Sequence, residues 1–81
     1  MRELKFEQIV EIFSEIVDLS GISMEENAVL GNDIPVDSKE MLRILSRIES
    51  RYRFRFDPKE VLTLKTLGDI FETTRRRANF K

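Results

Sequence analysis

The chain has 81 residues and a net charge of −1, and its length leaves room for one hydrophobic core, so we expect a single domain over residues 1–81. Its 41% hydrophobic and 36% charged residues, with no long uncharged apolar run, predict a soluble protein without a membrane span. The lack of cysteine and histidine excludes disulfides, thiolate nucleophiles and the usual zinc ligands, and it argues against an autonomous enzyme.

The first element is predicted to be an amphipathic helix. Apolar residues recur every three or four positions from Phe6 to Val17, and glutamates occupy another face. We expect the helix to end between Asp18 and Gly21, because Gly21 is the first residue that can reverse the chain at low cost. Residues 1–6 lack the basic head and apolar stretch of a secretory signal, so we expect a cytoplasmic protein.

Residues 21–36 are predicted to form a long loop, because they hold two glycines and Pro35 and show no helical periodicity. Ser23, followed three residues later by Glu26, would cap one helical turn within it. The apolar side chains expected to anchor the loop in the core are Met24, Val29 and Leu30. A loop of this length is unusual in so small a domain, so either it has a functional role or the assignment of residues 21–36 as a loop is wrong.

A second helix is predicted from Ser38 to Tyr52. Asp37 would cap it, and Glu40, three residues on, completes a capping box. On position alone, the Ser38 hydroxyl is interpreted as part of the helix cap. A phosphate attached to it would be stabilised by the free N–H groups and the positive end of the helix dipole. The residues expected on the apolar face are Met41, Leu42, Ile44, Leu45, Ile48 and Tyr52.

The segment after this helix alternates like a strand over residues 53–56, but a strand without a partner cannot build a sheet, so we expect an extended connector. Asp57 then offers a cap, and Pro58 suits the first position of a helix. We predict a short third helix that ends at Leu62 or Leu64.

The last helix is predicted to begin after Thr66, which forms a capping pattern with Asp69, and to end between Arg75 and Arg77. The arginines at its end suit the negative pole of the helix dipole. Together the elements predict an all-α fold, a small four-helix bundle of three longer helices and one short helix, with a long first loop and no strand.

The charges divide unevenly along the chain. Residues 1–37 hold 2 Lys or Arg against 9 Asp or Glu, and residues 38–81 hold 12 against 6. A basic stripe follows the second helix at intervals of four residues: Lys39, Arg43, Arg47, Arg51 and Arg55. Because like charges at this spacing repel, the stripe is either a solvated face or faces acidic groups of the first half or of a partner.

Several motifs together resemble the acyl carrier proteins and the related peptidyl and aryl carrier domains. That family has an Asp-Ser-Leu motif at the start of its second helix, a Leu-x-x-x-Leu-Glu-x-x-Phe run, and a final helix opened by Thr-Val or Thr-Leu. The matching residues are Asp37-Ser38, Leu42, Ile44, Leu45, Ile48-Glu49, Tyr52, Phe54, Phe56 and Thr66-Leu67-Gly68-Asp69-Ile70. The chain departs from the family at Lys39, where leucine is usual, and in its basic rather than acidic second helix.

The resemblance implies that Ser38, next to Asp37, is the attachment point of 4′-phosphopantetheine, installed from coenzyme A by a separate phosphopantetheinyl transferase. The chain would then be a non-catalytic carrier that holds acyl or related intermediates as a thioester. The implied pathways are fatty-acid, polyketide or other specialised acyl biosynthesis. The candidates to line an acyl pocket are Met41, Leu45, Val61 and Leu64.

The basic helix predicts that the carrier docks on acyl-transferring or acyl-activating enzymes with acidic docking surfaces. We expect the carrier to be a monomer. The expected docking residues are Lys39, Met41, Arg43, Arg47 and Arg51. Lys39 keeps open an alternative, a carrier-like helical interaction module without the prosthetic group. A nucleic-acid-binding helical domain is the other alternative, but the pI near 5.5, the acidic first helix and the missing glycine-containing turn argue against nucleic-acid binding.

Overall fold

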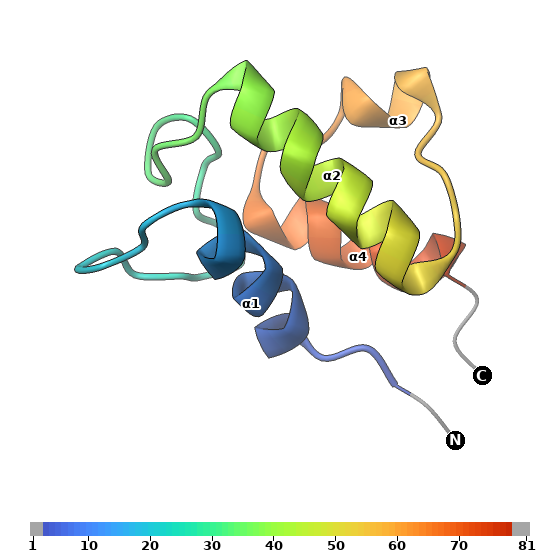
Figure 1. The fold of residues 1–81 in the computed structure, drawn as a ribbon, viewed down its shortest axis with the longest axis horizontal. Helices are drawn as coiled ribbons and strands as arrows, with labels where there is room; N and C mark the ends of the chain where they lie inside the picture. The colour runs from blue at the N-terminus through green and yellow to red at the C-terminus, as the bar shows by residue number, and fades with distance from the viewer. Residues whose placement is uncertain (1–2, 79–81) are drawn as a thin grey trace.

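The computed structural model describes residues 3–78, which form four helices and no strand, as predicted for an all-α bundle (Figure 1). The helices are α1, Phe6–Ile16; α2, Ser38–Tyr52; α3, Pro58–Val61; and α4, Leu67–Arg77. α1 packs against both α2 and α4, and in the view of Figure 1 α1 and α3 lie on opposite sides of α2. None of the helices within residues 3–78 combines the length and the apolar character that crossing a membrane requires.

The bounds of α2 are those predicted, because the capping box forms. The Glu40 N–H donates to Asp37 Oδ1 at 2.7 Å, and the Asp37 N–H donates to Glu40 Oε1 at 2.9 Å. At the other end, Arg53 adopts the left-handed conformation with φ 58°, and its N–H donates to the carbonyl of Glu49. Asp37 and Arg53 therefore fix the two ends of α2 through local interactions.

Two helices end earlier than predicted. α1 ends at Ile16, ahead of the expected stop between Asp18 and Gly21, because Val17 is already extended at φ −122° and ψ 141°. α3 is a single turn that ends at Val61, before the predicted end at Leu62 or later.

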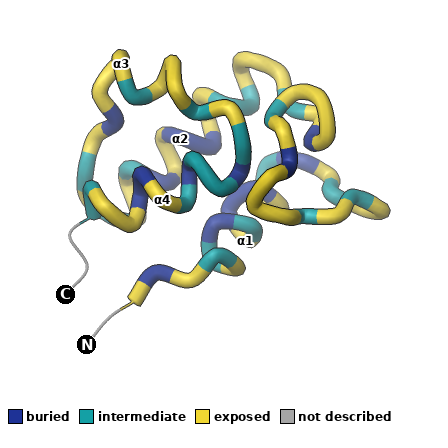
Figure 2. The backbone as a smooth tube through the Cα atoms, turned by 180° about the vertical axis from the view of Figure 1, so that it is seen from behind, coloured by how far each residue is buried: buried dark blue, intermediate teal, exposed yellow. Residues whose placement is uncertain are grey.

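The core lies where α1, α2 and α4 meet. Figure 2 shows buried stretches of these three helices at the centre of the molecule, whereas α3, at the edge, is exposed or intermediate along its whole length. The largest fully buried side chains are Phe13, Ile9, Ile12, Ile34, Ile44, Ile48, Leu67, Ile70 and Thr74. Burying an aliphatic side chain of this size contributes about 1.5–3 kcal/mol. The packing of these side chains in the core therefore supplies most of the apolar stabilisation.

The long loop after α1 is confirmed, but its core anchors are partly different from those predicted. Ala28 and Ile34 are buried, whereas Val29 is 39% exposed and Met24 and Leu30 are only half-buried. Val29 uses its backbone instead, because its N–H donates to the Asp33 carboxylate at 2.8 Å and its carbonyl accepts three turn hydrogen bonds.

The predicted helical turn at Ser23 does not form. A single turn spans Glu25 to Ala28, where the Ala28 N–H donates to the Glu25 carbonyl at 3.0 Å. The Ser23 hydroxyl donates to the Glu25 carboxylate at 3.3 Å and makes no cap for a helix.

Backbone hydrogen bonds join the loop to the start of α4. The Leu30 N–H donates to the Lys65 carbonyl at 2.9 Å, and the Leu67 N–H donates to the Ala28 carbonyl at 3.0 Å. The Gly68 N–H donates to the carbonyl of Glu26 at 2.8 Å. The loop is thus held in place by the chain segment that begins α4.

We predict that Gly68→Ala destabilises the protein, although alanine favours a helix over glycine by about 1 kcal/mol. A Cβ at Gly68 would lie 2.8 Å from the Glu26 carbonyl oxygen, which the Gly68 N–H already binds. Such overpacking costs about 1–3 kcal/mol, which exceeds the gain in helix propensity. Urea unfolding measures the difference, with Ser50→Ala on the exposed face of α2 as the control for propensity. A Gly68→Ala protein as stable as the wild type would contradict the close approach.

Candidate functional site

Ser38 is the first residue of α2, and its side chain is exposed. The side chain that caps the helix is Asp37, and within residues 3–78 the Ser38 hydroxyl has no hydrogen-bond partner. The interpretation of Ser38 as part of the cap is therefore wrong. Because the Asp37 carboxylate satisfies the Glu40 N–H, the N–H groups of Ser38 and Lys39 remain at the open end of the helix, where they suit an anion.

A cavity of about 410 Å³ opens beside Ser38. The loop, α2 and the α3 region each contribute to its lining, which consists of Leu30, Gly31, Val36, Asp37, Ser38, Met41, Leu42, Leu45, Val61 and Leu64. All four residues proposed from the sequence for an acyl pocket, Met41, Leu45, Val61 and Leu64, are therefore in the same cavity as Ser38. Its lining is predominantly aliphatic, so an apolar chain that starts at Ser38 would find an apolar surface within reach.

Two of the apolar residues that line this cavity, Leu42 and Val61, are exposed. Leu42 was expected on the buried face of α2, but it is 64% exposed. At 3.6 residues per turn, Leu42 lies about 160° around the helix from the fully buried Ile44, which explains why it faces solvent. Val61, the last residue of α3, is 37% exposed and lines the cavity as Leu42 does, so α2 and α3 each contribute an exposed apolar group to it. Leu62, the next residue in the chain, is 78% exposed.

The predicted basic stripe divides into two parts. Arg47 Nη1 lies 2.7 Å from Glu15 Oε1, and Arg51 Nη2 lies 3.5 Å from Glu15 Oε2, so the far half of the stripe faces α1. The hydrogen bond from Arg47 is the main cause that lowers the pKa of the Glu15 carboxyl. Lys39 and Arg43, nearer Ser38, are exposed and form no ion pair within the described part of the chain.

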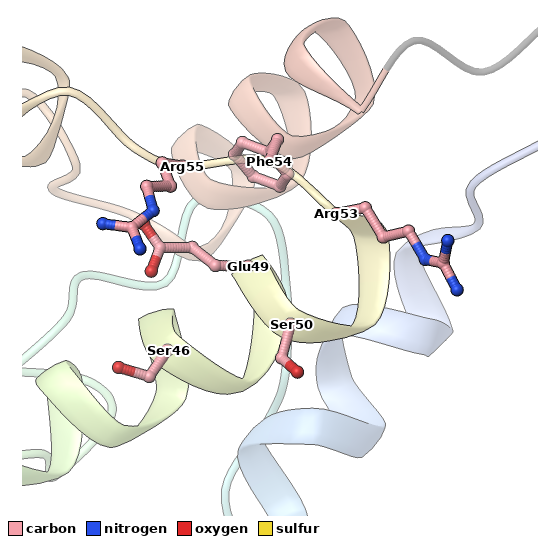
Figure 3. A pocket seen from close by; sticks show the side chains of 6 residues that line it. All are labelled: Ser46, Glu49, Ser50, Arg53, Phe54 and Arg55. Carbon is pink, nitrogen blue, oxygen red and sulfur yellow. The ribbon is translucent and has the colours of Figure 1, made fainter.

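A second hollow lies at the far end of α2, away from Ser38. Its lining residues are Ser46, Glu49, Ser50, Arg53, Phe54 and Arg55. Figure 3 shows Glu49 and Arg55 on one side of the helix end, whereas Arg53 points away to the other side. Glu49 Oε2 accepts the Phe56 N–H at 2.8 Å, so this carboxylate orders the connector after α2. None of the candidate site residues from the sequence lines this hollow.

Comparison with known proteins identifies a matching family model and a similar curated protein. The sequence model of a family described as "Phosphopantetheine attachment site" matches residues 7–73, from α1 into α4. A curated protein named "Acyl carrier protein", from Saccharopolyspora erythraea, is 25% identical over 69 residues, which cover 85% of this chain and 73% of that protein. No solved structure matches the chain significantly.

We predict that substitutions of two neighbouring residues affect stability differently. Asp37→Ala removes the cap of α2 and should lower the free energy of unfolding by about 1 kcal/mol. Ser38→Ala removes a hydroxyl that bonds to nothing in residues 3–78 and should stay within about 0.5 kcal/mol of the wild type. Urea titrations followed by circular dichroism measure both values. A larger loss for Ser38→Ala than for Asp37→Ala would mean that the serine is the cap.

Proposed function

The chain belongs to the acyl carrier protein family, whose phosphopantetheine attachment domain carries 4′-phosphopantetheine, and we propose that this chain carries the group on Ser38. The position of Ser38 supports it as the attachment residue. Its hydroxyl is exposed and unbonded at the first turn of α2, inside the segment that matches the family. Ser38 also lines the apolar cavity, so the proposed attachment point and the candidate cargo site adjoin.

The residues around Ser38 fit a phosphodiester. α2 is 15 residues long, and its dipole and first N–H groups favour a negative charge at its N-terminus. Asp37 is occupied by the Glu40 N–H, which leaves the N–H groups of Ser38 and Lys39 for the phosphate. The exposed ammonium of Lys39 adds a positive charge at this end of the helix.

The chain's own part in the function is to present and shelter the cargo. When bound, the arm supplies a thiol that holds the cargo as a thioester, which a chain without cysteine does not supply itself. Met41, Leu45, Val61 and Leu64 would cover part of an acyl chain, and each methylene removed from water stabilises the covered state by about 0.8 kcal/mol. We propose a non-catalytic, cytoplasmic, monomeric carrier for fatty-acid, polyketide or other specialised acyl biosynthesis.

We propose that partner enzymes dock on the end of α2 that carries Ser38. The exposed Leu42 offers an apolar contact, and Lys39 and Arg43 flank it with positive charge. An apolar centre with a charged rim is the usual arrangement of a protein interface, and charge complementarity requires an acidic partner. Acyl-transferring or acyl-activating enzymes, and the transferase that modifies Ser38, are the partners that this function needs. Met41 lies at the cavity, and Arg47 and Arg51 belong to the part of the stripe that faces α1.

The first test is the intact mass of the purified protein after incubation with coenzyme A, magnesium and a broadly tolerant phosphopantetheinyl transferase. We expect a gain of one phosphopantetheine in the wild type and none in Ser38→Ala, because the hydroxyl is the only group that the modification uses. A gain that persists in Ser38→Ala would place the attachment elsewhere.

If the folded wild type gains no mass, Lys39→Leu decides between two explanations. A gain in that variant would mean that the lysine excludes the transferase used. No gain in either protein would favour the alternative of an interaction module without the prosthetic group.

A second test addresses docking through Arg43→Glu, which reverses an exposed charge without breaking an ion pair within residues 3–78. We expect kcat/KM for transfer of cargo from the cognate loading enzyme to fall at least tenfold, and we expect the loss to shrink at high salt. Lys5→Glu, which makes the same charge change just before α1, is the matched control and should have little effect. Equal rates for the wild type and Arg43→Glu would exclude this end of α2 as the docking surface.

A further inference from the structure

α3 forms a wall of the Ser38 cavity but has little apolar attachment of its own. None of its residues is buried, and Leu62, the next residue, is 78% exposed. Yet Val61 and Leu64 line the cavity, so the position of this segment sets the position of one wall. Leu64 packs against the core, but α3 itself has no buried residue, so the polar contacts of α3 contribute to its position.

Arg77, the last residue of α4, makes such polar contacts. Its Nη1 donates a hydrogen bond to Glu60 Oε1 on α3 and lies 3.5 Å from Asp57 Oδ2 at the start of the same helix. Its Nη2 donates to the carbonyl of Arg55 at 3.1 Å. One guanidinium thus joins the end of α4 to the connector, to the cap residue of α3 and to α3 itself.

The ion pair between Arg77 and Glu60 is better shielded from solvent than the other ion pairs within residues 3–78. The side chains of Arg77 and Glu60 are 33% and 19% exposed, against 45% and 38% for Arg47 and Glu15. Glu60 Oε1 also accepts the Asp57 N–H at 2.8 Å. This backbone hydrogen bond is the main cause that lowers the pKa of the Glu60 carboxyl, and Arg77 lowers it further. Glu60 is therefore held as the carboxylate that Arg77 needs.

The neighbouring arginines differ from Arg77 in what they reach. Arg75 pairs with Glu72 of its own helix at 2.7 Å. Arg76 approaches Glu60 only at 3.7 Å, and its side chain is 66% exposed. Three consecutive arginines that have the same relation to the helix dipole thus have different contacts, and Arg77 alone among them bonds to both α3 and the connector.

We infer that Arg77 is a positioning residue for the cavity beside Ser38. It clamps α3 to the end of α4 and so fixes the position of the wall formed by Val61 and Leu64. The effect on cargo rests on the proposed function of Ser38, whereas the clamp itself does not. Without the clamp, α3 would separate more often from the bundle, and an acyl chain in the cavity would meet water more often.

The clamp is tested on the full chain without the prosthetic group, by hydrogen exchange of three amides of the α3 region. The N–H groups of Val61, Thr63 and Leu64 donate to the carbonyls of Asp57, Glu60 and Val61. We expect Arg77→Gln to raise their exchange rates about tenfold and to leave the amides of the α1 and α2 core unchanged. Arg75→Gln, which removes the same charge from the same turn, is the matched control and should leave all these rates unchanged. Equal protection in the two variants would overturn the inference.

The effect on cargo is tested after loading, by the rate at which hydroxylamine cleaves an octanoyl thioester and an acetyl thioester on the Ser38 arm. We expect Arg77→Gln to speed cleavage of the octanoyl thioester several-fold and to leave the acetyl thioester unchanged, because only the longer chain reaches the cavity. Arg77→Lys, which keeps the charge, should restore part of the protection. Identical octanoyl rates in the wild type and Arg77→Gln would overturn the cargo role. Failure to load Ser38 in both the wild type and Lys39→Leu would instead contradict the proposed function and leave the exchange result to decide on the clamp.

Discussion

The rotation of α2 about its own axis decides which of its side chains reach the core, the cavity and the solvent. Ile44 and Ile48 are fully buried in the core that α2 shares with residues of α1 and α4, and together they leave α2 one orientation that satisfies the core. Burial of two such side chains contributes more than any exposed ion pair, so the core sets the rotation and the charges follow it. With this orientation Ser38 lines the cavity, Arg43 faces solvent and Arg47 reaches α1.

The cavity exists because three separate segments converge beside the start of α2. The long loop brings Leu30 and Val36 to it, and backbone hydrogen bonds to the start of α4 hold the loop there. The α3 region brings Leu64 from the other side, and Arg77 ties that region to the end of α4. α4 therefore fixes both walls without lining the cavity itself, and the length of the loop has a structural reason: it must span from α1 to α4 and back to α2.

The sequence predicts best what local interactions decide. The starts of α2 and α4 follow from capping residues three positions apart, and both helices begin where the pattern places them. Burial was less predictable, because it depends on neighbours far along the chain. Ile34 lies between Asp33 and Pro35, a typical turn pattern, yet the loop folds back and buries it, whereas Leu42 fits the apolar pattern but faces solvent. The four candidate pocket residues were found because the family resemblance supplied the long-range arrangement that periodicity lacks.

Only part of the basic stripe on α2 is free to attract a partner in the folded structure. The single carboxylate of Glu15 pairs with both Arg47 and Arg51 and offsets one of their two positive charges, so this part of the stripe offers a partner less unpaired charge than its sequence suggests. Lys39 and Arg43 are the cations of the stripe that stay exposed beside Ser38. If partners dock as proposed, an acidic partner would therefore be attracted most strongly to the end of α2 that carries the proposed attachment point, and carboxylates around the entrance of its active site would bring that entrance to Ser38.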